Sequence, residues 1–387
     1  MKMDTIKSMN SFDRFDSVLH HQRADKVPFY FPTISCSVAA GILGRDVPAG
    51  GDSLHFKEES AVLKGKNAHK EFIEEHHEVT IELNRKLNAD VIRETWRSSD
   101  KPSKFLDGNT LLFELPGGER KIKRFFPENQ SYGVIEDTTK PRTIDQLKTR
   151  LLNEIESGDP AIPSEDIFGD QLKLRKLAEP YFPTIFNAAC PFIAIDDSVW
   201  LMASVVETAL IAEYILFKTE TYIKHLRWAA ENGFNFILGG SDAASSSGPI
   251  ISPEIYSKLM LKPLKMINKV CIENGMVYCY RSDGNMWKLM ETVFSKTGIG
   301  SFGEVDRDAG MTVEAVKNSY PNLIILGNIS SAVLHKGTEE QVRSHTAEGL
   351  RESNGFNYIA GPSNMIMHGT PVENVYAMVD EIDKFIP

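Results

Sequence analysis

The chain has 387 residues, of which 42% are hydrophobic and 25% charged, and a formal net charge of -10. This composition is ordinary for a soluble globular protein of one large or two modest domains. The acidic balance argues against nucleic-acid binding, which needs clustered Lys and Arg, and no apolar run approaches the roughly 20 residues of a membrane span. The four cysteines are scattered without a CxxC pair, which indicates a reduced, cytoplasmic protein.

The first half of the chain contains two strand candidates, residues 27–31 and 89–92, with a long charged helix between them at about 63–87. Residues 1–25 are interpreted as an N-terminal extension. His76 and His77 lie within the helical stretch, where adjacent residues point in different directions, and we expect both at the surface. Two strand-like runs between Leu111 and Arg124 flank Pro116-Gly117-Gly118, a turn sequence typical of a hairpin. Residues 109–125 are therefore interpreted as a hairpin insertion that covers one mouth of the fold.

The second half alternates strand and helix signals. Strand candidates lie at 184–188, 234–238, 276–280, 299–302, 323–326 and 356–360, and helical patterns lie at about 198–218, 220–232, 252–274, 286–297, 312–319, 339–353 and from 372 onward. Such alternation predicts βαβ units and a parallel sheet. With the two earlier strands the total is eight, which predicts a single TIM-type (β/α)8 barrel domain over residues 1–387. A doubly wound open sheet is the alternative, but no GxGxxG follows any strand.

The most informative segment is the strand candidate 276–280, which runs directly into Arg281-Ser282-Asp283-Gly284-Asn285. Barrels of this class place their chemistry on polar groups at the carboxyl ends of buried parallel strands. The same residues also fit a turn in which Asp283 or Asn285 caps the next helix. The segment alone does not decide between these interpretations.

Polar residues follow the neighbouring strands as well. Asp242 follows the strand at 234–238, Glu304 follows the strand at 299–302, Asn328 follows the strand at 323–326, and Asn364 and His368 follow the last strand. If the strands are parallel, these groups gather at one rim. Each residue alone also fits a structural role, since Asp and Asn cap helices and a lone loop His is often only hydrogen-bonded. Their occurrence after five successive strands favours a site.

Several ordered segments resemble the uroporphyrinogen decarboxylase superfamily, which includes corrinoid-linked methyltransferases. The stretch LHHQRADKVP from Leu19 to Pro28 is similar to that family's NHxxPDRVP motif. The remaining matches are Asp242 with Gly248, Ser252-Pro253-Glu254 and Pro263 (D…G…SPE…P), Arg281 to Asn285 (His-Ser-Asp-Gly-Asn or His-x-Cys-Gly in many members), Leu326 to Ile329, and Thr370 to Asn374. The resemblance spans nearly the whole chain and implies a TIM-type barrel.

One departure from the family concerns metal binding. In the zinc-dependent methyltransferases a His and two Cys hold zinc, but here Arg281 stands at the His position, Asp283 at the first Cys position, and the late ligand falls near Asn364. The resemblance therefore implies that the usual zinc site is absent. A different, oxygen-rich site is left open, because zinc accepts carboxylate ligands such as Asp242, Asp283 and Glu304 together with His368.

The resemblance implies a methyltransferase of a corrinoid-dependent system, which moves a methyl group between a small O- or N-methylated molecule and a corrinoid protein docked over the barrel mouth. Asp283 or His368 would supply a proton and Arg281 would steady negative charge, with Asp242 also in the catalytic group. Ser282, Asn285, Glu304, Asn328 and Asn364 would contact the substrate. The corrinoid would be carried by the partner protein, and the methyl donor, the acceptor and the oligomeric state are not indicated.

Two alternatives remain open at this point. A decarboxylase of a carboxylated, tetrapyrrole-like ring would use Arg281 to bind a carboxylate. The arginine-rich N-terminal motif of the family's decarboxylases has no counterpart here, however, apart from the lone Arg23. The third interpretation is a non-catalytic binding protein that kept the barrel but lost the metal site.

Overall fold

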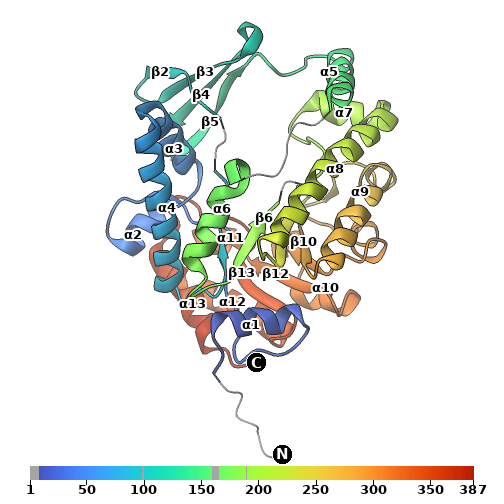
Figure 1. The fold of residues 1–387 in the computed structure, drawn as a ribbon. Helices are drawn as coiled ribbons and strands as arrows, with labels where there is room; N and C mark the ends of the chain where they lie inside the picture. The colour runs from blue at the N-terminus through green and yellow to red at the C-terminus, as the bar shows by residue number, and fades with distance from the viewer. Residues whose placement is uncertain (1–7, 98–99, 159–164, 189) are drawn as a thin grey trace, which may run out of the picture.

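The computed structural model describes residues 8–97, 100–158, 165–188 and 190–387, and a curled sheet of seven parallel strands forms its centre (Figure 1). The strands follow one another around the sheet in chain order: β1 (Ile92–Arg93), β6 (Thr184–Asn187), β7 (Phe236–Gly240), β10 (Val277–Arg281), β11 (Ser301–Gly303), β12 (Ile324–Ile329) and β13 (Tyr358–Pro362). This confirms the predicted parallel α/β sheet. An order that follows the chain, with helices outside, is that of a TIM-type barrel.

Residues 28–30 join the two edges of this sheet, although the predicted strand at 27–31 does not form. The Phe29 carbonyl accepts a hydrogen bond from the Asp90 amide at 2.7 Å, just before β1. On the other side the Tyr30 amide donates to the Ala360 carbonyl of β13 at 3.0 Å, and Phe29 forms an isolated parallel bridge with Ala360. Pro28 has no amide hydrogen, so the segment cannot build a continuous ladder. It links the edges through single bridges.

Side chains alternate between the barrel interior and the surrounding helices, as expected for strands. In β10, Cys279 belongs to an interior cluster with Leu238, Ile324 and Ile359. Tyr280 points outward, where its hydroxyl lies 2.7 Å from that of Tyr256 in α9. Because residues 279 and 281 share a face, the alternation turns Arg281 into the mouth of the barrel.

Helix α1 (Ser11–Leu19) closes the opposite end of the barrel (Figure 1). Phe15 packs edge-on against Phe236 of β7, with ring centres 5.4 Å apart. Arg14 is buried and forms ion pairs with Asp25 at 2.7 Å and with Asp90 at 2.5 Å. The other Asp90 carboxylate oxygen accepts from the Phe29 amide at 3.0 Å, so this network fixes the segment that joins the sheet edges.

The other helices surround the barrel: α2 (Cys36–Leu43), α3 (Asp52–Lys64), α4 (Lys66–Lys86), α5 (Ile144–Ser157), α6 (Glu165–Ala178), α7 (Ser198–Val206), α8 (Thr208–Glu231), α9 (Pro253–Glu273), α10 (Val313–Ser319), α11 (Ser331–Lys336), α12 (Glu339–Ser353) and α13 (Val372–Lys384). Ser252 caps α9 as its sequence predicts, accepting from the Ile255 amide. The helix expected at 286–297 is reduced to a short π-helical segment, Glu291–Ser295.

The helix predicted at 198–218 is instead two helices, α7 and α8, which meet at Glu207 and are bent by 111°. Within the described residues, no single helix has the length and apolar composition needed to cross a membrane. This bent pair meets those criteria only when both helices are taken together.

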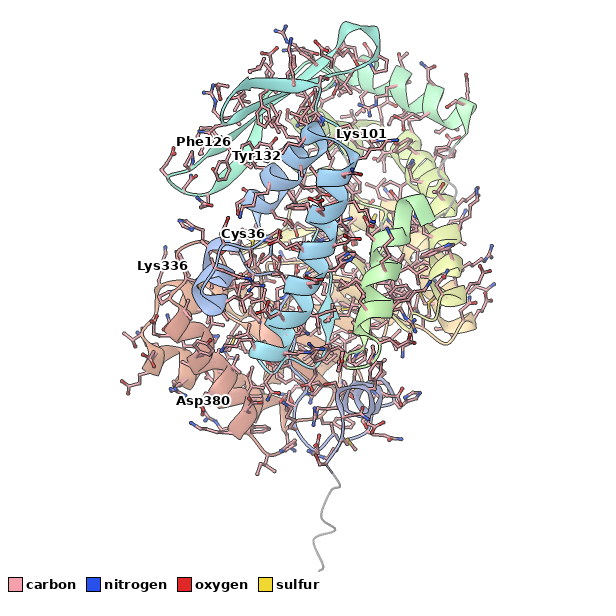
Figure 2. All side chains as sticks on the ribbon, turned by 60° about the vertical axis from the view of Figure 1, so that its left-hand side comes forward. Cys36, Lys101, Phe126, Tyr132, Lys336 and Asp380 are labelled. Atoms are coloured by element: carbon pink, nitrogen blue, oxygen red, sulfur yellow. The ribbon has the colours of Figure 1, made fainter. Side chains whose placement is uncertain are left out.

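A separate antiparallel sheet, β2-β3-β4-β5, stands beyond α3 and α4 (Figures 1 and 2). Its strands are β2 (Lys104–Asp107), β3 (Thr110–Glu114), β4 (Arg120–Phe126) and β5 (Ser131–Asp137), and Leu112 of β3 pairs with Ile122 of β4. The sheet is anchored on α3, where Phe56 stacks on Phe125 with ring centres 4.7 Å apart. The sequence did not indicate β2, which is exposed throughout, or β5. The division into extension, barrel and insertion stays a prediction, and residues 1–7 of that extension lie outside the described residues.

The surface prediction for His76 and His77 is wrong. Their side chains are buried, because α4 contacts α3 on one side and α6 on another. His76 Nδ1 lies 2.8 Å from the Pro48 carbonyl, and burial lowers its pKa to about 4. His77 Nε2 lies 3.4 Å from a Glu94 carboxylate oxygen. The two side chains do point in different directions from the helix, but both directions lead into the protein interior.

Replacing Arg14 tests the network at the closed end. We expect Arg14→Met to lower the free energy of unfolding by about 3–5 kcal/mol, because Asp90 loses its buried counter-ion. The matched control is Arg45→Met, since Arg45 pairs with Glu82 on an exposed surface and its replacement should leave stability nearly unchanged. Urea denaturation measures both. Equal small losses would show that the network does not hold the barrel closed.

Candidate active site

Two buried charges and one half-buried charge meet at the mouth of the barrel. Arg93 ends β1, Arg281 ends β10, and Glu304 directly follows β11. One Glu304 oxygen accepts from Arg281 Nη1 at 2.7 Å and the other from Arg93 Nη1 at 3.3 Å. Glu304 and Arg93 are 3% and 7% exposed, so one buried carboxylate pairs with two guanidinium groups, and its single negative charge balances one of their two positive charges.

The backbone at Glu304 has a φ of +58°, a left-handed conformation that non-glycine residues seldom adopt. Its amide donates to the Leu326 carbonyl of β12 at 3.0 Å. This turn interrupts the alternation of side-chain directions along the strand. As a result, the Glu304 carboxylate lies between the two arginines. Burial lowers the pKa of Arg93. Burial also opposes the charge of Arg281, but Glu304 and Asp242 outweigh it and raise the pKa of that guanidinium.

Asp283 is a candidate proton donor at this mouth. Asn364 Nδ2, from the segment after β13, donates to its carboxylate at 2.7 Å. Burial, followed by the negative charges of Glu304, Asp242 and Asp306, raises the pKa of Asp283 to about 7, against the opposing charge of Arg281. A carboxyl group with a pKa near neutrality carries its proton for an appreciable fraction of the time, as a general acid requires.

Three of the predicted substrate contacts make internal hydrogen bonds. The Ser282 hydroxyl is buried, accepts from the Ala243 amide at 3.0 Å and donates to the Asp283 carbonyl at 3.1 Å. Asn285 Nδ2 donates to a loop carbonyl after β11, and its Oδ1 accepts from the amide two residues on. Asn328 Nδ2 donates to two more carbonyls, at 3.1 and 2.9 Å. These side chains therefore connect the loops of this rim through hydrogen bonds to backbone groups.

His368 lies at the surface, where its Nδ1 is 2.7 Å from the Ser37 hydroxyl. Among the described residues, none of the site carboxylates forms a hydrogen bond or ion pair with it. The part of the chain that the structure describes contains no group of three or more His, Cys, Asp or Glu that would hold a metal ion. Both Glu304 oxygens already bind guanidinium groups, so the residues here do not fit the oxygen-rich metal site considered from the sequence.

A cavity of about 360 Å³ opens beside Arg281. Its lining includes three aromatic side chains, two carboxylates and one guanidinium: Trp96, Phe192, Tyr222, Asp196, Asp242 and Arg281. The volume is at the small end of the range for ligand pockets. Of the predicted catalytic residues, Arg281 and Asp242 face this cavity, and Asp283 follows Arg281 by two residues on the same strand end.

Sequence reasoning missed four residues of this region. Arg93 and Asn187 end the first two strands, and Arg93 Nε donates to Asn187 Oδ1 at 3.2 Å. The rule applied to the later strands, a polar residue at the carboxyl end, would have found both. Trp96 lies farther along the same loop, 47% exposed. Tyr30 is fully buried below the charges, its hydroxyl has no hydrogen-bond partner among the described residues, and no sequence signal marks it.

TIM-type (β/α) barrels carry their active sites at the carboxyl ends of their strands, and the charged mouth of this curled parallel sheet lies at those ends. The sequence profile of the family described as uroporphyrinogen decarboxylase (URO-D) matches residues 186–385, more than half of the chain. The chain belongs to this family, and a family named for an enzyme supports an enzymatic role. No curated protein sequence matches the chain.

Two solved structures resemble the chain at low sequence identity. A methyltransferase from Methanosarcina mazei is 18% identical with a TM-score of 0.64, over 97% of this chain and 99% of that one. A 3-keto-D-glucoside 4-epimerase from E. coli is 13% identical with a TM-score of 0.35, over 64% of this chain and 95% of that one. The first likeness extends the fold assignment to nearly the whole chain.

The raised pKa of Asp283 predicts a pH-dependent loss of stability. Its folded pKa of about 7 exceeds the ordinary 3.8, so between these values the folded protein binds more protons than the unfolded chain, and stability falls as pH rises. Relative to Asp283→Asn, the wild type should therefore lose on the order of 2 kcal/mol between pH 5 and pH 8. Urea denaturation at both pH values measures this. Asp16→Asn, at the closed end and exposed, should show no such difference.

Removing the charge of Glu304 tests the pairing itself. Glu304→Gln leaves the buried Arg93 and the half-buried Arg281 without their shared counter-ion and should cost about 3–5 kcal/mol of unfolding free energy. It should also shift the pH dependence of Asp283 to lower pH, because Glu304 contributes the largest charge effect on that carboxyl group. Glu82→Gln, at an exposed ion pair, is the control. A stability loss no larger than that of the control would argue against the pairing.

Proposed function

We propose that the chain is a methyltransferase of a corrinoid-dependent system that moves a methyl group between a small O- or N-methylated molecule and a corrinoid protein. The observation that carries this proposal is the charge balance at the barrel mouth. Both guanidinium groups bind Glu304, and Asp242, Asp283 and Asp306 add further acidic groups around them. Such a mouth suits a neutral or cationic substrate.

The same balance disfavours the decarboxylase alternative. A ring with several carboxylate groups needs several unoccupied cationic partners, and bidentate guanidinium contacts are the strongest of these. Here the Glu304 carboxylate takes one nitrogen of each of the two arginines, and the cavity beside Arg281 measures about 360 Å³. The shared fold with a methyltransferase over nearly the full chain agrees with the proposed reaction.

Each residue of the mouth has a role in such a reaction. A reduced corrinoid on a partner protein would supply the electron pair that receives the methyl group. When the methyl group leaves an oxygen or an uncharged nitrogen, that atom keeps the bonding pair and needs a proton, which Asp283 is placed to give. Asn364 orients the Asp283 carboxyl group, and Arg281 steadies charge on the leaving atom. No step involves zinc, because the residues present do not fit it.

Methyl transfer to reduced cobalamin tests the proposal. Purified protein is incubated with free cob(I)alamin and a panel of methoxyarenes and N-methylated amines, and the visible spectrum reports methylation. We expect transfer from at least one compound, and Asp283→Asn should slow transfer from a methoxyarene by about 100-fold. Asp16→Asn should leave the rate unchanged. Absence of transfer from the whole panel, also with corrinoid protein in place of free cobalamin, would favour the non-catalytic interpretation.

A further inference from the structure

We propose that the cavity beside Arg281 binds a methylated ammonium cation, so that the methyl donor is a quaternary amine and not an anionic methoxyarene. This inference rests on the proposed function and names its substrate class. Three observations carry it: the aromatic lining, the carboxylates without ion-pair partners, and the arginine that already has a carboxylate partner.

Aromatic rings form much of the cavity wall. Trp96 and Phe192 are 47% and 52% exposed, which is high for such large apolar side chains, and Tyr222 lines the same space. Ring faces attract cations within about 6 Å of their centres, and Trp attracts them most strongly. The Arg93 guanidinium carbon already lies 6.0 Å from the centre of the Trp96 ring. The wall therefore offers the surface that quaternary ammonium groups prefer.

Two carboxylates complete the lining. Asp196 and Asp242 are both exposed and face the cavity. Within the described parts of the chain, neither carboxylate forms a hydrogen bond or an ion pair within 4.0 Å. Each therefore keeps its charge available to a ligand. A methylated ammonium group donates no strong hydrogen bond, so nearby charge and ring faces are the contacts it can use.

The cationic side chain in the cavity lining already has a carboxylate partner. Arg281 Nη1 lies 2.7 Å from the Glu304 carboxylate, which is itself outside the cavity. The net charge of the cavity lining is therefore negative, and the whole chain also has a negative net charge of -10. An anionic methoxyarene would meet two unpaired carboxylates, whereas an ammonium ion would be attracted by both.

The chemistry balances without a further reagent. The bond between the methyl carbon and nitrogen breaks, its electron pair stays on nitrogen, and a neutral tertiary amine leaves. The methyl carbon bonds to the cobalt of the reduced corrinoid, which contributes the electron pair for the new bond. No proton is required, so Asp283 serves only donors whose leaving atom is oxygen or uncharged nitrogen.

Binding of an isosteric pair tests the inference without any corrinoid. Choline and 3,3-dimethylbutan-1-ol have the same shape, and only choline carries the charge. By isothermal titration we expect choline to bind at least about 10-fold tighter, and more weakly as salt is added. Equal affinities, tighter binding of 4-methoxybenzoate, or no binding of choline would each overturn the inference.

Matched variants locate the binding site. Trp96→Leu and Asp242→Asn should each weaken choline binding by about 3- to 30-fold, while Trp96→Phe, which keeps a ring, should retain most of it. The controls are Tyr181→Leu, an aromatic residue 52% exposed after α6, and Asp16→Asn at the closed end. Circular dichroism and thermal denaturation establish that each variant is folded. Loss of affinity in the controls as large as in the cavity variants would overturn the assignment.

The methyl-transfer assay separates this inference from the proposed function. If choline binds and methoxyarenes alone donate methyl groups, the function stands and the substrate class is wrong. If choline binds through Trp96 and Asp242 but no compound donates a methyl group, the binding site stands and the methyltransferase proposal fails. Transfer from choline that Asp283→Asn leaves within about threefold, against a loss of about 100-fold with a methoxyarene, would support both.

Discussion

The site depends on one buried carboxylate placed between a buried and a half-buried guanidinium group. Glu304 brings together the ends of β1 and β10 through Arg93 and Arg281, which sequence separates by nearly two hundred positions. A buried charge is tolerated only with a partner, so each arginine depends on Glu304 for its presence at the mouth. The arrangement also balances one of the two positive charges that the arginines would otherwise offer a substrate.

This pairing also sets the protonation of the neighbouring acid. Among the charges that raise the pKa of Asp283, that of Glu304 is the largest, and Arg281 opposes it less because it is shared with Glu304. A freely exposed arginine at the same position would have kept Asp283 ionised. The neutral form of Asp283 and the low free positive charge of the mouth therefore have a common origin.

The barrel was predictable from sequence because its signals are local. Alternating strand and helix patterns, strand-end polar residues and the Ser252 cap each involve only a few consecutive residues. The unpredicted features are relations between distant segments. The network of Arg14 with Asp90, the burial of His76 and His77 between helices, and the joining of the sheet edges at Phe29 all depend on tertiary contacts. The position of Arg93 at a strand end was predictable, but its pairing with Glu304 was not, because Glu304 lies far along the chain.

Strand-end polar residues divide into two groups that sequence does not separate. Ser282, Asn285 and Asn328 direct their hydrogen bonds to backbone groups of neighbouring loops, and their side chains stabilise the rim. Asp242 and Arg281 follow strands in the same way, but they face the cavity. The distinction follows from the partners available, because a side chain surrounded by unpaired backbone groups satisfies them first. The rim is therefore fixed where its amides and hydroxyl face the loops, whereas carboxylates and aromatic rings remain uncovered on the side of the cavity.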